Sequence, residues 1–413
     1  MAVRTQAHAR GTRATPSARS FAPALVVWSG WLVLMAGANL ATPLYAVYAT
    51  KFGFSTLVLT LIFATYAVVL VPALILFGRL SDRFGRRPVI LAGLTTACCA
   101  LALFALAESS GWLYAARALQ GLAVGMISGA ATAALVELDP EDDRRRAAMF
   151  AGLAQAGGSA AGPLLAGVLA QWAPEPLRLP FYVGLALTVV AAAAALTLSE
   201  ASDGEREPWR IQWPRVPREI RRDFARVSVT AATVWATVAL YLSIVPSYAR
   251  GLLGTSNLAL LAAISALALI ASFLTQIVSQ RYRLGLRLSQ AIGLALLAVG
   301  LLALVLASPL GSLALLVAGA VAAGVGHGLG FLNAQEELND LAPQERRGEV
   351  TAAFIACIYF LVASSVISTG LLDLHFSLTV SVGAVAVVLC CCAFGTAGWQ
   401  LQNRGHRTAR RGV

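Results

Sequence analysis

The chain has few charged residues, which make up 12% of its 413 residues, whereas 58% are hydrophobic. A soluble domain carries about 25% charged residues, so this composition and the mean hydropathy of +0.74 exclude a soluble protein. The uncharged apolar runs are long. They favour membrane helices, whose backbone hydrogen bonds form within each segment, over a membrane barrel.

Residues that carry enzyme or metal chemistry are also scarce. No H-E-x-x-H stretch and no Cys–His pair occurs, and the six cysteines all lie inside apolar runs. All 20 acidic residues can be placed in loops or at the ends of apolar runs. We therefore expect neither an enzyme nor a bound cofactor or metal. The net charge of +11 is carried between the apolar runs, so it indicates membrane topology and not nucleic-acid binding.

Twelve apolar runs are long enough to cross a hydrocarbon core of about 30 Å. They are predicted at about 22–46, 56–77, 88–107, 111–136, 147–171, 180–198, 227–249, 257–279, 287–307, 311–335, 350–371 and 377–399. All but four of the 31 basic residues then fall on one side of the membrane. Loops rich in Arg and Lys stay in the cytoplasm, so we expect both termini there.

One long polar connection, residues 200–226, divides the chain into two sets of six spans. The expected organisation is a basic cytoplasmic tail (1–20), a first six-helix bundle (21–199), a cytoplasmic linker (200–226), a second bundle (227–400) and a basic tail (401–413). The two halves also repeat in sequence. Pro43-Leu-Tyr45 matches Pro246-Ser-Tyr248 at an offset of 203 residues, and Gly-x-x-x-Gly pairs in the fourth and tenth spans share that offset. The fold class predicted is all-α and integral to the membrane, with two pseudo-symmetric six-helix bundles.

The loop between the second and third spans reads Gly-Arg-Leu-Ser-Asp-Arg-Phe-Gly-Arg-Arg-Pro over 78–88. It resembles the loop between helices 2 and 3 of the major facilitator superfamily of secondary transporters, G-x-L-x-D-R-x-G-R-R. The resemblance implies a conformational latch whose Asp and Arg contacts break during alternating access. The residues assigned to this latch are Gly78, Asp82, Arg83, Gly85, Arg86, Arg87 and, at the end of the fourth span, Glu137.

Two further stretches resemble signatures of the same superfamily. Arg117-Ala-Leu-Gln120-Gly121 is similar to its R-x-x-Q-G element, which implies an arginine beside a central cavity; the alternative is an arginine that extends to the membrane surface. The fifth span contains an element that resembles G-x-x-x-G-P-x-x-x-G of the drug–proton antiporter branch, although close helix packing alone would also explain it. The residues of that element are Gly158, Gly162, Pro163 and Gly167.

A proton carrier is harder to find in the sequence. Antiporters of this branch often carry an Asp in the first span four residues before a Pro, where this chain has Asn39. His327 is the one residue deep in a span that titrates near neutral pH, so it is the candidate proton site; a structural histidine is the alternative. Candidates for the substrate cavity are polar or aromatic residues within apolar spans, each of which could instead make one interhelical hydrogen bond. They are Asn39, Tyr45, Tyr66, Gln155, Asn333 and Tyr359.

The resemblance implies a transporter of a bacterial plasma membrane that works by alternating access, and we expect it to act as a monomer. Proton-driven export is what the resemblance to the drug–proton antiporter branch implies. Because few charged residues are available to line a cavity, the expected solutes are small amphiphilic or drug-like molecules. The alternative is uptake of a small nutrient or metabolite by the same fold. A more distant alternative is a membrane sensor or enzyme that transports nothing.

Overall fold

The computed structural model describes residues 21–77, 80–141, 143–199, 213–243, 245–279, 281, 284–343 and 346–402. The first half contains α1 (Ala22–Asn39), α2 (Tyr45–Phe52), α3 (Thr56–Phe77), α4 (Leu80–Phe84), α5 (Arg86–Ala105), α6 (Ser110–Glu137), α7 (Arg144–Trp172) and α8 (Leu179–Ala195). The second contains α9 (Arg221–Ser243), α10 (Val245–Leu253), α11 (Leu258–Ser279), α12 (Leu286–Ala307), α13 (Leu313–Leu341), α14 (Arg347–Leu372) and α15 (Leu378–Gln402). Within these residues, eleven helices are long and apolar enough to cross a membrane, and α8 is a shorter apolar helix.

These helices coincide with the twelve predicted spans, with three differences. The first span is interrupted by a 3₁₀ turn at Thr42–Leu44, where Pro43 cannot donate a backbone hydrogen bond. Helix α9 begins at Arg221, inside the predicted linker, and α13 continues to Leu341, beyond the predicted end of its span. The predicted tail 1–20, the latch residue Gly78, linker residues 200–212 and tail residues 403–413 lie outside the described residues.

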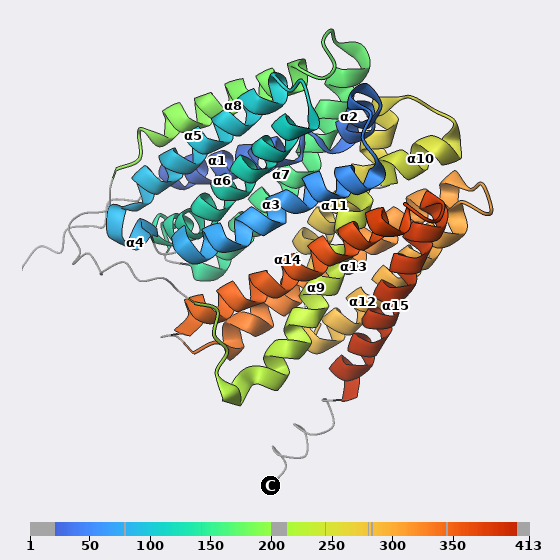
Figure 1. The fold of residues 1–413 in the computed structure, drawn as a ribbon. Helices are drawn as coiled ribbons and strands as arrows, with labels where there is room; N and C mark the ends of the chain where they lie inside the picture. Colours follow the sequence, from blue (N-terminus) through green and yellow to red (C-terminus); the bar gives the residue numbers. More distant parts are fainter. Residues whose placement is uncertain are drawn as a thin grey trace, which may run out of the picture.

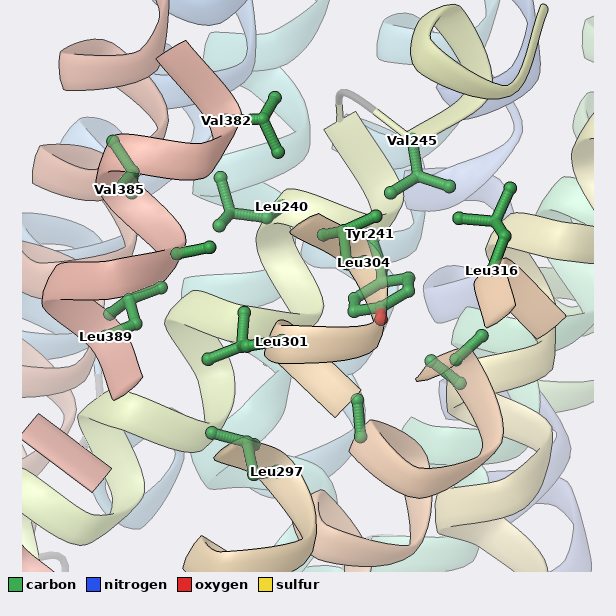
Figure 2. Close-up of a cluster of buried hydrophobic side chains, with 14 of the residues drawn as sticks. Leu240, Tyr241, Val245, Leu297, Leu301, Leu304, Leu316, Val382, Val385 and Leu389 are labelled. Carbon is green, nitrogen blue, oxygen red and sulfur yellow. The ribbon is translucent and has the colours of Figure 1, made fainter. Parts of the chain in front are cut away.

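The helices form two groups, blue to green and yellow to red in Figure 1. Two clusters of buried apolar residues consist of first-half side chains, apart from Leu258, and two others consist of second-half side chains. A small fifth cluster joins Ala160 of α7 to Val238, Leu242 and Leu269 of the second half. Figure 2 shows the larger cluster of the second group, in which Leu297, Leu301 and Leu304 of α12 gather with Leu240 of α9 and Leu389 of α15. Each bundle therefore has its own apolar interior, which is distinct from the apolar surface that faces lipid.

The internal repeat is visible in two matching hydrogen bonds. The Tyr48 hydroxyl donates to the Phe104 carbonyl at 3.3 Å, and the Tyr248 hydroxyl donates to the Leu304 carbonyl at 3.2 Å. Donor and acceptor are 56 residues apart in both halves. Tyr248 thus corresponds to Tyr48 and not to Tyr45, which corrects the offset expected for the first and seventh spans. The helix before the break has 18 residues in the first half and 23 in the second.

The two bundles meet along two helix pairs, α3 with α14 and α7 with α11. Near the end of the molecule that holds α2 and α10, glycines bring the helices into close contact. A methyl group on Gly167 of α7 would overlap Ala262 of α11, and one on Gly370 of α14 would overlap Thr60 of α3. Helix α4 lies at the opposite end of the first bundle (Figure 1). We call these the α2 end and the α4 end.

Candidate functional site

At the α4 end, one guanidinium joins three helices. Gly85 has a φ of 94°, a left-handed conformation that favours glycine, and it turns the chain from α4 into α5. Arg86 then contacts Asp82 of α4 at 2.5 Å and Glu137 of α6 at 2.7 Å, and it also donates to the Ser81 hydroxyl at 2.6 Å. The structure therefore brings together three of the five charged residues that the sequence assigned to a latch, namely Asp82, Arg86 and Glu137.

The other arginines of this loop are arranged differently. Arg83 is exposed, with its guanidinium carbon 5.6 Å from the centre of the Phe84 ring, and Arg87 is half-buried in the first turn of α5. The side chains of Asp82 and Glu137 remain 34% and 42% exposed. Exposed ion pairs contribute about 0–1 kcal/mol to stability, so these contacts can be made and broken at little cost.

A second charged pair lies nearby, between α6 and α7. The Asp139 side chain is 2% exposed and pairs with Arg146 through two hydrogen bonds of 2.7 Å. It also accepts the backbone N–H groups of Glu141 and Asp143, at 2.9 and 3.1 Å. The Arg146 guanidinium, and then these backbone donors, hold the pKa of the Asp139 carboxyl well below its ordinary value. The carboxylate fixes the turn that leads into α7.

The substitution Asp139→Asn is expected to lower stability by about 2 kcal/mol at pH 7, because charge-assisted hydrogen bonds are lost. The pKa of this group is lowered by folding, so its contribution is complete above the ordinary carboxyl value near 4 and declines as the pH falls below it. Melting temperatures of the purified protein in detergent, from pH 7 to pH 3, measure this. The difference between the two proteins should stay constant down to about pH 5 and then shrink. A difference that widens in acid would contradict the assignment.

About two turns from the start of α6, Arg117 is 3% exposed. It donates to the Ala38 carbonyl at 2.7 Å and to the Gln120 side-chain oxygen at 2.9 Å, and Gln120 in turn donates to the Gly37 carbonyl at 3.0 Å. The arginine therefore does not extend to the membrane surface. It is directed inward, against the end of α1.

Aromatic rings surround this guanidinium. Its central carbon lies 5.2 Å from the ring centre of Tyr45, 5.3 Å from that of Phe63 and 5.8 Å from that of Tyr66. Tyr66 also meets Tyr359 of α14, edge to face, with ring centres 6.1 Å apart. Since α14 belongs to the second bundle, three predicted cavity residues, Tyr45, Tyr66 and Tyr359, lie in one group that crosses the boundary between the bundles.

His327 of α13 is 1% exposed. Its Nδ1 lies 2.8 Å from the Ser272 hydroxyl of α11, which accepts a hydrogen bond from Gln276 at 3.2 Å. The ring contacts Trp235, edge to face with ring centres 4.7 Å apart, and Phe331, stacked with ring centres 5.7 Å apart. The second ring nitrogen, Nε2, has no hydrogen-bond partner among the described residues. The histidine is thus held by one nitrogen and retains one unused donor or acceptor inside the bundle.

The amide side chains predicted for the cavity are mostly directed back to their own helices. Asn39 donates to the Met35 carbonyl at 2.9 Å, and Asn333 donates to the Leu329 carbonyl at 2.8 Å. Asn333 also offers its backbone carbonyl to Gln290, at 3.4 Å. Gln155 is half-buried on α7 and makes no side-chain hydrogen bond to a described residue. These residues are not part of the aromatic group around Arg117.

The signature glycines are packing positions. A Cβ atom on Gly121 would lie 2.5 Å from the Tyr66 carbonyl oxygen, which brings α6 against α3. On α7, a Cβ atom on Gly158 or Gly162 would overlap carbonyl groups of α1, whereas Gly167 faces the other bundle. Pro163 lies inside the same helix without ending it. Gly158 and Gly162 therefore pack α7 against α1, and Gly167 packs α7 against α11 near the α2 end.

The second bundle contains a buried polar cluster that the sequence did not predict. We call it the α9 cluster. It consists of Asp223, Arg226 and Thr230 on α9, Arg287 and Gln290 on α12, Glu337 on α13 and Gln400 on α15. The Arg226 side chain is fully buried and that of Glu337 is 9% exposed. Their hydrogen bonds measure 2.5 and 3.2 Å, and Arg287 approaches the same carboxylate at 3.3 Å.

Amide groups complete the α9 cluster. Gln290 donates to Glu337 at 2.7 Å and accepts from Gln400 at 2.6 Å. Gln400 also donates to Thr230 at 3.0 Å and accepts from Arg226. Two arginines and two carboxylates, with Asp223 as the second, give the cluster a formal charge near zero. The α9 cluster joins four helices of the second bundle. Its arginines are paired with carboxylates, whereas the hydrogen-bond acceptors of Arg117 are neutral.

The chain is similar in sequence to a known family and to several known proteins. The sequence matches the profile of the Major Facilitator Superfamily over residues 27–366. It is 32% identical over 139 residues to a tetracycline resistance protein, class E, of Escherichia coli, which covers 34% of this chain and 33% of that protein. It is 28% identical over 125 residues to Multidrug resistance protein 2 of Bacillus subtilis (strain 168), which covers 30% of each chain. The aligned parts span about a third of the length of these relatives.

Solved structures match over nearly the whole chain. The D-xylose-proton symporter superimposes with a TM-score of 0.75 at 16% identity, covering 92% of this chain and 97% of that one. The nucleoside transporter NupG superimposes with a TM-score of 0.71 at 12% identity, covering 93% and 99%. At these identities the match concerns the fold, and it agrees with two bundles of six membrane helices.

Proposed function

The chain belongs to the Major Facilitator Superfamily, and on that premise we propose that it exports small amphiphilic or drug-like molecules across the inner membrane of a bacterium, driven by protons. The observation that carries the proposal is the contact from Arg117 through Tyr66 to Tyr359. It places a buried charge and two phenols where the bundles meet, which is where transporters of this architecture handle substrate. The resistance proteins among the relatives support export over uptake.

Alternating access then follows from the two interfaces between the bundles. The glycine contacts of α7 with α11 and of α3 with α14 close the α2 end. Opening that end requires the bundles to rock about the contact between them, and the Arg86 contacts at the α4 end must change in step. We place the α4 end in the cytoplasm, because the predicted arginine-rich segments belong to that side.

A cellular assay tests export. The chain is produced in a bacterial host that lacks its main efflux pumps, and accumulation of fluorescent amphiphiles is measured before and after a protonophore is added. Lower accumulation that the protonophore restores is the expected result. Higher accumulation than in the empty host indicates uptake, and unchanged accumulation of every compound, together with no flux in proteoliposomes, contradicts a transporter of such molecules.

His327 is the proposed proton site, because it is a buried histidine within a span of the second bundle and its Nε2 has no hydrogen-bond partner among the described residues. Its contacts are the neutral groups Ser272, Trp235 and Phe331. His327→Gln is therefore expected to abolish the response of export to an imposed pH gradient in proteoliposomes. His375→Gln, at the exposed turn after α14, is the control and should leave the response unchanged. An unaltered pH profile in His327→Gln would leave His327 with a packing role.

A further inference from the structure

We propose that the transported solute is an amphiphilic anion, with a carboxylate or similar group on an aromatic or apolar frame, and that Arg117 binds the negative charge. This inference rests on the proposed function and specifies its substrate class. The positive charge of Arg117 is not balanced by a negative charge among the described residues. Arg117 is 3% exposed, yet its two hydrogen-bond acceptors, the Ala38 carbonyl and the Gln120 amide, are both neutral.

No described carboxylate pairs with this arginine, and its Nε has no hydrogen-bond partner among the described residues. Arg226 provides the internal comparison. It is as deeply buried, but Glu337 and Asp223 neutralise it. Buried charges in proteins are normally paired, because the loss of hydration is costly. Arg117 therefore lacks the partner that the chain supplies elsewhere.

The neighbouring helices do not supply an acid in another conformation either. The last residue of α1, Asn39, is neutral and donates to its own helix. Two described carboxylates are buried: Asp139, which Arg146 already neutralises, and Glu337, which three other side chains already share. A rearrangement that moved Glu337 to Arg117 would leave Arg226 with the partly exposed Asp223 alone. The charge at the boundary between the bundles is thus positive.

The rings around Arg117 define the rest of the solute. Tyr45, Phe63 and Tyr66 stabilise the guanidinium by cation–π contacts, which recover only part of the cost of burying a charge. The same rings offer apolar faces to a flat, hydrophobic frame once the bundles separate. An anionic head group can accept a hydrogen bond from the free Nε while the frame packs between Tyr66 and Tyr359. A cationic amphiphile would meet a like charge in a medium of low dielectric constant.

Matched compounds test the charge preference directly. Triplets of a carboxylate, its neutral primary amide and the corresponding amine are made on one-, two- and three-ring aromatic frames. Binding to the full chain in detergent is measured by the shift in melting temperature and by titration. The expected result is that at least one carboxylate binds about tenfold more tightly than its amide, as a charge-assisted hydrogen bond implies, and that the amines bind more weakly than the amides.

Two variants locate the effect. Arg117→Met should abolish the preference for carboxylate over amide, and Arg117→Lys, which keeps the charge, should retain part of it. The melting temperature of each variant without ligand shows whether it has folded. If no carboxylate binds more tightly than its amide, or if the preference survives in a folded Arg117→Met, the proposal is overturned. Flux in proteoliposomes is measured separately: binding with charge preference but without flux of any compound would refute the transport function and leave the anion site standing.

Discussion

Glu337→Ala is expected to destabilise the protein by about 3–5 kcal/mol, because it leaves the buried guanidinium of Arg226 without its main counter-ion. The Arg226 side chain is fully buried and makes two hydrogen bonds to this carboxylate. Gln290 and Arg287 would lose an acceptor in the same step. The measurement is the fraction of protein that remains monodisperse by size exclusion after heating in detergent. The yield of folded protein from membranes should fall as well.

Glu336→Ala is the matched control, since Glu336 precedes Glu337 on the same helix but is exposed. It should change stability by less than about 0.5 kcal/mol. The double variant Arg226→Met, Glu337→Met should recover most of the stability, because replacing both members of a buried pair by apolar groups of similar volume is far less costly than removing one. If Glu337→Ala and Glu336→Ala melted at the same temperature, the α9 cluster would not be holding the four helices together.

The fold could be predicted from the sequence because lipid imposes a simple rule. A helix that spans the bilayer must be apolar over its length, so the uninterrupted apolar runs mark the helices directly. The deviations have local causes. Pro43 breaks the first span at Thr42–Leu44, and α9 begins early because Phe224 and Arg226, in its first two turns, are buried in the second bundle.

The α9 cluster could not be predicted with the same ease. Arg226 follows Arg221 and Arg222 in the sequence, and a run of arginines at a predicted membrane boundary indicates topology. Its partner Glu337 is 111 residues away. One signal was present: Asp223, Arg226 and Thr230 recur at spacings of three and four residues, which places them on one face of a helix. Polar residues on one face predict a buried partner only when the facing helix is known.

The candidate site was predicted unevenly for a related reason. The contact of Arg86 with Asp82 and Glu137 follows from a loop pattern in which the residues are close in sequence or fixed by the resemblance, and the structure contains it. The cavity residues were selected by type and depth, which does not give side-chain direction. Tyr45, Tyr66 and Tyr359 therefore gather around or near Arg117, whereas Asn39 and Asn333 turn back to their own helices.

Asp82→Asn is expected to reduce transport severalfold, by at most about fivefold, because an exposed ion pair worth up to about 1 kcal/mol changes the ratio of two conformations by no more than that factor. The substitution leaves Arg86 with Glu137 and the Ser81 hydroxyl but removes the charged partner at 2.5 Å. We propose that the three charges stabilise one end state of the transport cycle and release it in the other. Transport per folded molecule in proteoliposomes, with reconstituted protein quantified, measures the effect.

The partial exposure of Asp82 and Glu137 allows a latch, whose contacts break during transport, to be distinguished from a contact that only stabilises the fold. Because Asp82 and Glu137 are 34% and 42% exposed, Asp82→Asn should lower the melting temperature little, and the same holds for Glu137→Gln. Glu141→Gln is the control of equal charge change at this end, since Glu141 is 73% exposed and pairs with Arg146. It should leave transport unchanged. A large loss of stability in Asp82→Asn without a loss of transport per folded molecule would show that Arg86 only fastens the loop, because a contact that never breaks in the cycle cannot set its rate.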